Sequence, residues 1–173
     1  MSCIALESIV KSCDNNSGGI EKIWINQQDN IDVAEVGTAP LDWTIDTLTL
    51  AVGAPDFTVF EIRRNTGSYT EDAAIDLVNG SSYVTATINL MFHRRDQDKS
   101  QAIRILGAGQ QYLVAIVKDM NGKYWYFPFL QLSAVGEGSG TTRADGSKYS
   151  VTLVSENDFL SYEILESVVE AVI

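Results

Sequence analysis

Apolar and polar residues alternate through the middle of the chain, between residues 57 and 129. The clearest run follows Tyr83, where every even position is apolar and Thr or Asn stands between: Val84, Ala86, Ile88, Leu90 and Phe92. A period of two is typical of a strand with one buried side and one solvent-facing side. We therefore predict a long strand over residues 83–92.

The same kind of pattern, bounded by turn residues, predicts further strands. They cover residues 20–26, 45–52, 57–64, 110–120, 123–127 and 149–154, and residues 31–36 and 159–165 are further strand candidates. Asn121-Gly122 predicts a two-residue type I′ hairpin turn, because such a turn needs positive φ at both positions. Pro128 predicts that the strand before it ends there, at an edge or terminus, since proline donates no hydrogen bond to a sheet.

The spacing changes after Phe92. Ala102, Ile103 and Leu106 recur at helical intervals, Asp96 stands at a capping position and Gly107 follows the last apolar residue. These features predict a short helix over about 96–106.

Two polar segments interrupt the strands. Residues 65–76 are small and polar, and the span 65–82 is predicted to be either a long hairpin or a loop that orders only against a partner. Residues 134–146 contain four glycines, which predicts a flexible loop or a loop bound to a neighbour.

These elements predict a mainly-β (α+β) fold, a β-sandwich or barrel of seven or eight strands with one flanking helix and a long hairpin loop. At 173 residues the chain fits one domain. We divide it into an N-terminal arm (1–19), the β domain (20–158) and a C-terminal strand or arm (159–173), of which 166–173 form a short helix or an arm.

The charge narrows the possible partners. The chain has 12 Lys and Arg against 23 Asp and Glu, a net charge of -11. Bulk attraction to nucleic acid or to anionic membranes needs cations, so it is not expected. The first residues lack the pattern of a signal peptide, and no apolar run approaches the length of a membrane span.

The sequence offers little for catalysis. Its one histidine, His93, is expected at the surface and gives no scope for a Ser-His-Asp arrangement. The glycines of 136–140 resemble a phosphate loop in composition only, and the carboxylates lack the order of a calcium loop. Cys3 and Cys13 with one histidine do not make a zinc set, and reduced thiols are favoured over a disulfide. We therefore expect no catalytic, cofactor or metal site, and no enzyme.

Two surface features point to other subunits. The aromatic residues of 124–129 alternate between faces, so one face needs cover from the helix, a loop or a neighbouring subunit. The doublets Arg63-Arg64 and Arg94-Arg95 are cations on an acidic chain, which indicates contact with acidic surfaces of another copy. Ordinary solubility charges at strand ends are the alternative.

The order of these segments resembles virion proteins of tailed phages. The resemblance is to tail-tube-type proteins in phages of gut Bacteroidota, including the crAss-like group. It covers roughly residues 13–158 and rests on the runs GGIEKIWI, SYTED, MFHRRDQDKSQAIRIL, VAIVKDMNGKYWYFP and YSVTLVSEN.

The resemblance implies subunits that continue their sheets from copy to copy into a six- or twelve-fold ring around a DNA channel. The helix would pack outside the ring, while residues 65–80 and the arms would contact the adjacent tail or portal-proximal ring. DNA would pass through the lumen without specific binding during genome ejection. From the net charge we add the hypothesis that the lumen is acidic and repels phosphates. The implied location is the virion tail, assembled in the host cytoplasm, with no membrane or cofactor.

We predict subunit contacts at Arg63, Arg64, Tyr69, Glu71, Asp72, Arg94, Arg95 and Trp125. A hypothesis from a different class is a small-ligand or glycan-binding β-barrel. It requires a cavity lined by aromatic residues such as Trp24, Trp125 and Tyr126, and it predicts a stable monomer.

Overall fold

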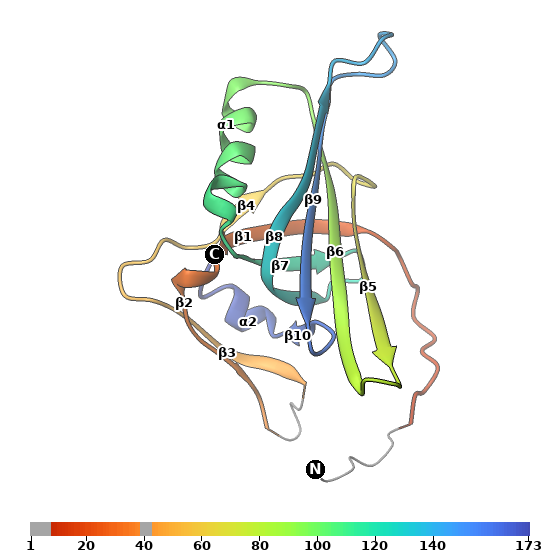
Figure 1. The fold of residues 1–173 in the computed structure, drawn as a ribbon, viewed down its shortest axis with the longest axis vertical. Helices are drawn as coiled ribbons and strands as arrows, with labels where there is room; N and C mark the ends of the chain where they lie inside the picture. The colour runs from red at the N-terminus through yellow and green to blue at the C-terminus, as the bar shows by residue number, and fades with distance from the viewer. Residues whose placement is uncertain (1–7, 39–42) are drawn as a thin grey trace.

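The computed structural model describes residues 8–38 and 43–173. These residues form ten strands and one long and one short α-helix (Figure 1). The strands are β1 (Ile20–Gln27), β2 (Ile31–Val36), β3 (Thr44–Leu50), β4 (Thr58–Phe60), β5 (Gly67–Asp76), β6 (Ser81–His93), β7 (Leu113–Asp119), β8 (Tyr124–Gly138), β9 (Lys148–Asn157) and β10 (Tyr162–Ile164). The helices are α1 (Gln97–Leu106) and α2 (Glu166–Val169), and short 3-10 turns cover Gln28–Asn30 and Ala108–Gln110. The predicted mainly-β fold with one flanking helix is confirmed.

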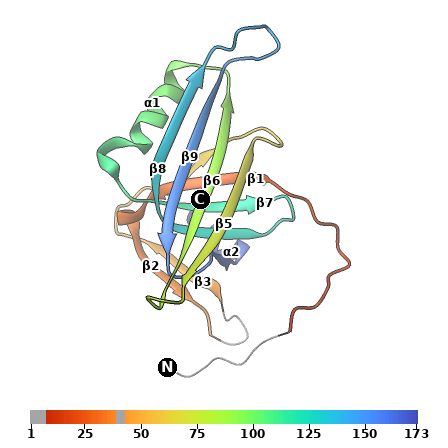
Figure 2. The ribbon, with the colours of Figure 1, turned by 45° about the vertical axis from the view of Figure 1, so that its right-hand side comes forward.

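The strands form two layers that share β8 (Figure 2). One layer has the order β2-β3-β10-β8-β7-β1-β4, and the other has the order β8-β9-β6-β5. All neighbours are antiparallel except β10 and β3, which are parallel. We call the second group the four-stranded layer.

The prediction that Pro128 ends a strand is wrong, because β8 bends there and continues. Leu113 pairs with Leu130 while Ala115 pairs with Phe127, so the register with β7 shifts at this point. Phe129 has a φ of 54°. Proline is tolerated at such an irregularity, which here turns β8 out of one layer and into the other. Residues 134–138 therefore belong to the strand rather than to the predicted glycine-rich loop.

Two apolar cores cover both faces of the aromatic hairpin. The core between the layers contains Phe127 and has Trp125 packed against it, whereas Tyr124 and Tyr126 belong to the core on the other side. That second core is closed by Ile45 of β3, Ile164 of β10 and Val169 of α2, among others. The sequence predicts that one face of the aromatic hairpin must be covered. Strand β3 and the C-terminal segment of the same chain cover it.

The predicted helix is confirmed as α1. The Asp96 side chain accepts a hydrogen bond from the Lys99 backbone nitrogen at 2.8 Å, and it also contacts the Lys99 ammonium group. At the other end Gly107 has a φ of -93°, so it is not required for a left-handed cap. A Cβ at Gly107 would lie 2.7 Å from Cδ2 of Leu132. Glycine therefore eases the close packing of α1 on β8, although the tip of the Leu132 side chain could turn aside for a larger residue.

The predicted type I′ turn at Asn121-Gly122 is wrong, since only Gly122 has positive φ, at 81°. Its backbone nitrogen donates to the Asp119 carbonyl oxygen at 3.1 Å. The Asp119 carboxylate accepts from the backbone nitrogens of Asn121 at 2.8 Å and Lys123 at 2.9 Å. These hydrogen bonds to the Asp119 carboxylate stabilise a wider turn, in which only Gly122 needs a positive φ. The strand predicted over 57–64 is likewise shorter, because only Thr58–Phe60 pair with β1.

Candidate subunit interface

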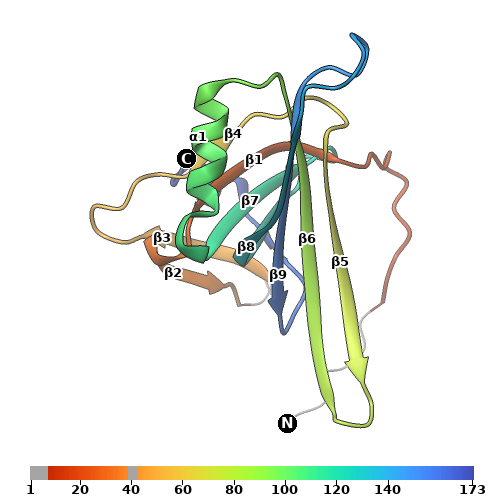
Figure 3. The ribbon, with the colours of Figure 1, turned by 45° about the horizontal axis from the view of Figure 1, so that its top comes forward.

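Strands β5 and β6 form a long hairpin that projects beyond the body of the molecule (Figure 3). Their register runs without a shift from Gly67 opposite Leu90 to Asp76 opposite Ser81. Residues 65–80 are thus the predicted hairpin, and the alternative of a loop ordered only by a partner is wrong. Within the described chain β5 pairs with β6 alone, so its other edge is free to accept a strand.

The hairpin tip is ordered and apolar. The Asp76 carboxylate accepts from the backbone nitrogens of Val78 at 2.8 Å and Asn79 at 3.1 Å, and from Nδ2 of Asn79 at 2.6 Å. These hydrogen bonds lower the pKa of Asp76, because they favour its charged form. Leu77 and Val78 are 90% and 93% exposed. An ordered tip with two bare aliphatic side chains is suited to contact with another surface.

The four-stranded layer has a second free edge on β8. After its bend β8 pairs with β9 alone among the described strands, and residues 133–137 are exposed. Because each strand of this layer is antiparallel to the next, β5 and β8 run in opposite directions. Ser68 of β5 and Ala134 of β8 lie in one row of the layer, through Asn89 and Thr152. The two edges could therefore pair antiparallel between copies in the same orientation.

The outer face of this layer is polar and mostly uncharged. Most of the side chains that alternate with the core positions there carry hydroxyl or amide groups, and Tyr83, Met91 and Val154 are apolar exceptions. The polar ones are Ser68, Thr70, Thr85, Thr87, Asn89, Ser150 and Thr152. Near the hairpin end, Asp72 and Glu156 flank Thr85 in one row and place two carboxylates on the face. This face therefore presents hydroxyl and carboxylate groups to the solvent.

Four of the eight predicted contact residues are exposed and have no salt bridge in the described chain: Arg63, Arg64, Asp72 and Arg94. The arginines lie at the end of the layer opposite the hairpin tip. Arg63 begins a turn in which Thr66 donates to its carbonyl oxygen, and β5 starts just beyond at Gly67. Arg94 follows β6, and its backbone nitrogen donates to the Ser147 carbonyl oxygen at 2.8 Å. Arg95, at the same end, pairs with Glu137 at 3.0 Å.

The other three predicted contact residues are half-buried and have partners within the chain. Tyr69 meets Phe127 edge to face with ring centres 5.3 Å apart. Burial above all, and then the charges of Asp119 and Glu71, raise the pKa of Tyr69 to about 12. The Glu71 carboxylate accepts from Ser161, and Nε1 of Trp125 donates to Oδ2 of Asp119 at 3.1 Å.

The sequence reasoning did not single out Asp119 or Ser161. An aspartate directly before a turn that contains Asn-Gly is a signal for Asp119, because its carboxylate can reach the backbone nitrogens that the turn exposes. Nothing local marks Ser161, whose partner Glu71 lies 90 positions away.

His93 is not the surface residue that the sequence predicts. Strand β6 continues to His93, which pairs there with Lys148 of β9, and the side chain is half-buried. Its Nδ1 atom is buried and has no hydrogen-bond partner.

The aromatic residues proposed to line a ligand cavity do not converge. Trp24 and Tyr126 are buried in one core, and Trp125 packs against the other. Trp125 instead borders an open depression of about 480 Å³ with Trp43, Phe159 and Tyr162.

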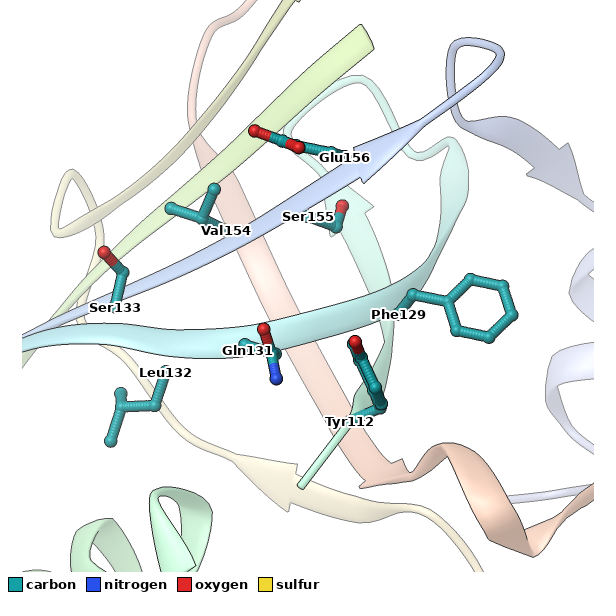
Figure 4. Close-up of a pocket in the computed structure, with 8 residues that line it drawn as sticks. All are labelled: Tyr112, Phe129, Gln131, Leu132, Ser133, Val154, Ser155 and Glu156. Atoms are coloured by element: carbon teal, nitrogen blue, oxygen red, sulfur yellow. The ribbon is translucent and has the colours of Figure 1, made fainter. Parts of the chain in front are cut away.

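A larger depression, of about 620 Å³, lies where β8 bends (Figure 4). Tyr112, Phe129 and Gln131 line one part of it, and Ser155 and Glu156 another. Glu156 is the one carboxylate in its lining, so a pair of acid and base groups is missing from the depression. Across residues 8–38 and 43–173, His, Cys, Asp and Glu side chains nowhere gather in threes that could hold a metal ion. Cys13 is an exposed free thiol, and Cys3 lies outside the described residues.

No helix in the described part of the chain is long and apolar enough to cross a membrane.

No family model and no curated protein matches the chain. Solved structures that are similar to it in fold include the following two. One is a chain of the virion of native gene transfer agent (GTA) particle, with a TM-score of 0.46 and 11% identity over 62% of this chain and 88% of that chain. The other is Hcp1 from Salmonella typhimurium, with a TM-score of 0.40 and 10% identity over 86% of this chain and all of that chain. The first is a virion component, the class of protein that the sequence resembles; at these scores neither similarity bears on function.

Proposed function

We propose that this chain is a structural subunit of a tailed-phage virion that closes into a ring, six- or twelve-fold, around the path of the genome. The observation that supports the proposal is the pair of free edges on the four-stranded layer, β5 on one side and residues 133–137 of β8 on the other. Closing the ring joins β5 of one copy to β8 of the next. It removes both edges, which in an isolated subunit would invite aggregation.

The ring places the outer face of the four-stranded layer around the lumen. That face carries hydroxyl and amide side chains, and Asp72 and Glu156 add a belt of carboxylates when the row repeats around the ring. Carboxylates repel phosphates, so DNA passes without lodging. Helix α1 packs on the opposite side of the layer, with Ile103 and Leu106 in the core between the layers.

The setting of this function is the virion tail, with assembly in the host cytoplasm and with other tail or portal-proximal ring proteins above and below. Genome ejection through the lumen is the role of the ring in the particle. The subunit performs it by shape and charge alone, as a conduit and not as an enzyme.

Negative-stain imaging and mass photometry of the purified chain test ring formation. Rings of uniform diameter are the expected result. A strictly monomeric protein at high concentration contradicts the proposal, and a monomer that also binds glycans at the depression beside Trp125 favours the ligand-binding alternative.

A cysteine pair tests which edges meet. With Cys3 and Cys13 changed to serine, Ser68→Cys and Ala134→Cys place one thiol on each edge in the same row of the layer. Oxidation of the double variant should give a ladder of covalent multimers that ends at the ring size. Each single variant is the matched control and should give no ladder. Rings without a ladder in the double variant show that this row of β5 does not meet the same row of β8 between copies.

A further inference from the structure

The open depression beside Trp125 is lined mainly by aromatic side chains, and we call it the aromatic depression. It holds about 480 Å³. Trp43 and Thr44 border it at the start of β3, and residues 159–163 border it where the chain enters β10. Its volume lies within the range of small-molecule sites, about 300–1,000 Å³.

An unusual backbone conformation places Trp43 at the surface. Its φ is 67°, in the left-handed region that a bulky side chain rarely adopts. Its ring stacks on Tyr162, with ring centres 6.3 Å apart and planes at 14°. Because Trp43 is 57% exposed, the other face of its indole is open to solvent. A strained backbone that presents a large flat ring in this way is typical of a binding site.

Two further residues enlarge the apolar surface around Tyr162. The ring of Phe159 packs on Tyr162 with ring centres 4.8 Å apart, and Phe159 and Leu160 are both exposed. A contiguous group of exposed apolar side chains indicates a surface that binds another molecule.

Hydrogen-bonding groups lie beside the rings, and their charge is compensated. Glu163 is the one charged residue in the lining, and its Oε1 accepts from the ammonium group of Lys123 at 2.6 Å, which leaves Oε2 as an acceptor. Burial raises the pKa of Tyr162, so its hydroxyl keeps the proton that it can donate. Thr44 adds a second hydroxyl.

We propose that the aromatic depression binds a neutral carbohydrate. A sugar ring has an apolar side of C–H groups, which packs on an aromatic face, and hydroxyl groups around its rim, which need hydrogen-bond partners. The open face of Trp43 takes the C–H side of the sugar. Glu163 and Tyr162 bind its hydroxyl groups.

The surroundings disfavour the other ligands that aromatic sites bind. A peptide that adds as a strand needs a free edge, whereas β3 and β10 are each paired on both sides within the described chain. Nucleic-acid bases stack on aromatic rings, but their phosphates need cations, and Lys123 is already bound to Glu163. An organic cation would compete with Lys123 for the same carboxylate.

This site goes beyond the proposed ring and does not depend on it. Ring closure uses β5 and residues 133–137 of β8, none of which line the aromatic depression. The site also differs from the ligand-binding barrel considered from the sequence. That barrel required Trp24, Trp125 and Tyr126 to converge on one cavity, and it predicted a stable monomer.

Saturation-transfer NMR of the purified chain tests the site. The probes are glucose, galactose, mannose and N-acetylglucosamine, and the disaccharides cellobiose, maltose, lactose and chitobiose. At least one should bind with a dissociation constant on the order of 1 mM, as expected of a shallow site with few contacts. Saturation should be strongest at the C–H protons on one side of the sugar ring, because that side packs on Trp43.

Trp43→Gly removes the aromatic face without imposing strain, because glycine adopts a φ of 67° freely. It should weaken sugar binding by about tenfold or more, since the stacked contact is lost. Tyr112→Ala is the matched control, because Tyr112 is an aromatic residue of similar exposure outside the aromatic depression, and it should leave binding unchanged. Circular dichroism checks that both variants fold.

The outcomes separate this site from the ring. Failure of all eight sugars to bind the folded chain, or binding that Trp43→Gly leaves unchanged, overturns the carbohydrate site. Binding of tetramethylammonium or of an oligoproline peptide in place of the sugars also overturns it, because the depression then serves a cation or a proline-rich partner. Rings that bind no sugar leave only ring closure standing, and a monomer that binds sugar leaves only the site.

Discussion

The carboxylate of Glu71 accepts two hydrogen bonds from Ser161, one from the backbone nitrogen at 2.6 Å and one from Oγ at 2.8 Å. Glu71 lies on β5, and Ser161 lies between β9 and β10. The pair therefore ties the projecting hairpin to the segment that leads into the second core. Glu71 was predicted to contact another subunit. Within the described chain its carboxylate is hydrogen-bonded to Ser161.

Glu71→Ala should lower the free energy of unfolding by roughly 2 kcal/mol, because it leaves two donors of Ser161 without their charged acceptor in a half-buried site. Urea denaturation of the chain measures the change. Asp72→Ala is the matched control, since Asp72 is exposed on the opposite face of β5 and should change stability by less than about 0.5 kcal/mol. Equal effects of the two substitutions would show that the hydrogen bonds to Ser161 contribute nothing.

Asp119→Asn tests the aspartate that holds the aromatic hairpin. The amide oxygen can still accept from the backbone nitrogens of Asn121 and Lys123, but its nitrogen then faces Nε1 of Trp125, where two donors meet. We expect a loss of about 1–3 kcal/mol in the free energy of unfolding.

Trp125→Phe isolates that clash. In a double-mutant cycle, Asp119→Asn should cost clearly less in the Trp125→Phe background than in the unmodified chain, because the opposing donor is gone. If Asp119→Asn lowers the free energy of unfolding equally in both backgrounds, Asp119 stabilises the chain only through its hydrogen bonds to the backbone of the turn.

The elements that follow from the sequence are those whose signals are local. The alternation from Val84 to Phe92 predicted β6, and the capping residue and glycine around residues 96–107 predicted α1. Both signals are local, because the strand and helix periods can be recognised within one short stretch of sequence. The bend of β8 was missed because proline is excluded from a regular ladder but permitted at an irregularity, and only pairing with β7 and β9 creates that irregularity.

The candidate interface could be predicted in part. Charge and polarity marked the arginine doublets and the hairpin, but they could not tell which residues satisfy one another inside the fold. Glu71 and Trp125 find partners at Ser161 and Asp119, and the contact between Glu71 and Ser161 depends on how distant strands pack. The free edges of β5 and β8 likewise exist only in the assembled layer.

Buried tyrosines should make the fold sensitive to alkali. Burial is the first cause that raises the pKa of both Tyr69 and Tyr126 to about 12, from an ordinary value of 10.0. Between these values the unfolded chain has lost protons that the folded chain keeps, so stability falls as pH rises from about 10 to about 12. Below pH 10 this contribution is constant.

Urea midpoints measured across this pH range check the expectation. Tyr69→Phe and Tyr126→Phe should each make the alkaline decline shallower, since phenylalanine has no proton to lose. Tyr83→Phe, at an exposed position of β6, is the matched control and should leave the decline unchanged. A decline that persists undiminished in the double variant Tyr69→Phe, Tyr126→Phe would have another origin.

Gly67→Ala tests how tightly the start of β5 packs on β1. A Cβ at Gly67 would lie 2.5 Å from Cδ1 of Ile62 and 3.1 Å from Cβ of Ile20. The Ile62 methyl can turn aside, but Cβ of Ile20 is fixed to the backbone of β1, so the hairpin must shift. We expect a loss of about 1–3 kcal/mol in the free energy of unfolding, the usual cost of overpacking.

The control for Gly67→Ala is Gly136→Ala on β8, where a Cβ would come no closer than 3.9 Å to Ser150. Alanine should be neutral or slightly stabilising at that site, because it restricts the unfolded chain without strain. Ile62→Val in the Gly67→Ala background should recover only part of the loss, since the contact with Ile20 remains. Full recovery would show that the side chain of Ile62, and not β1, limits the approach of β5.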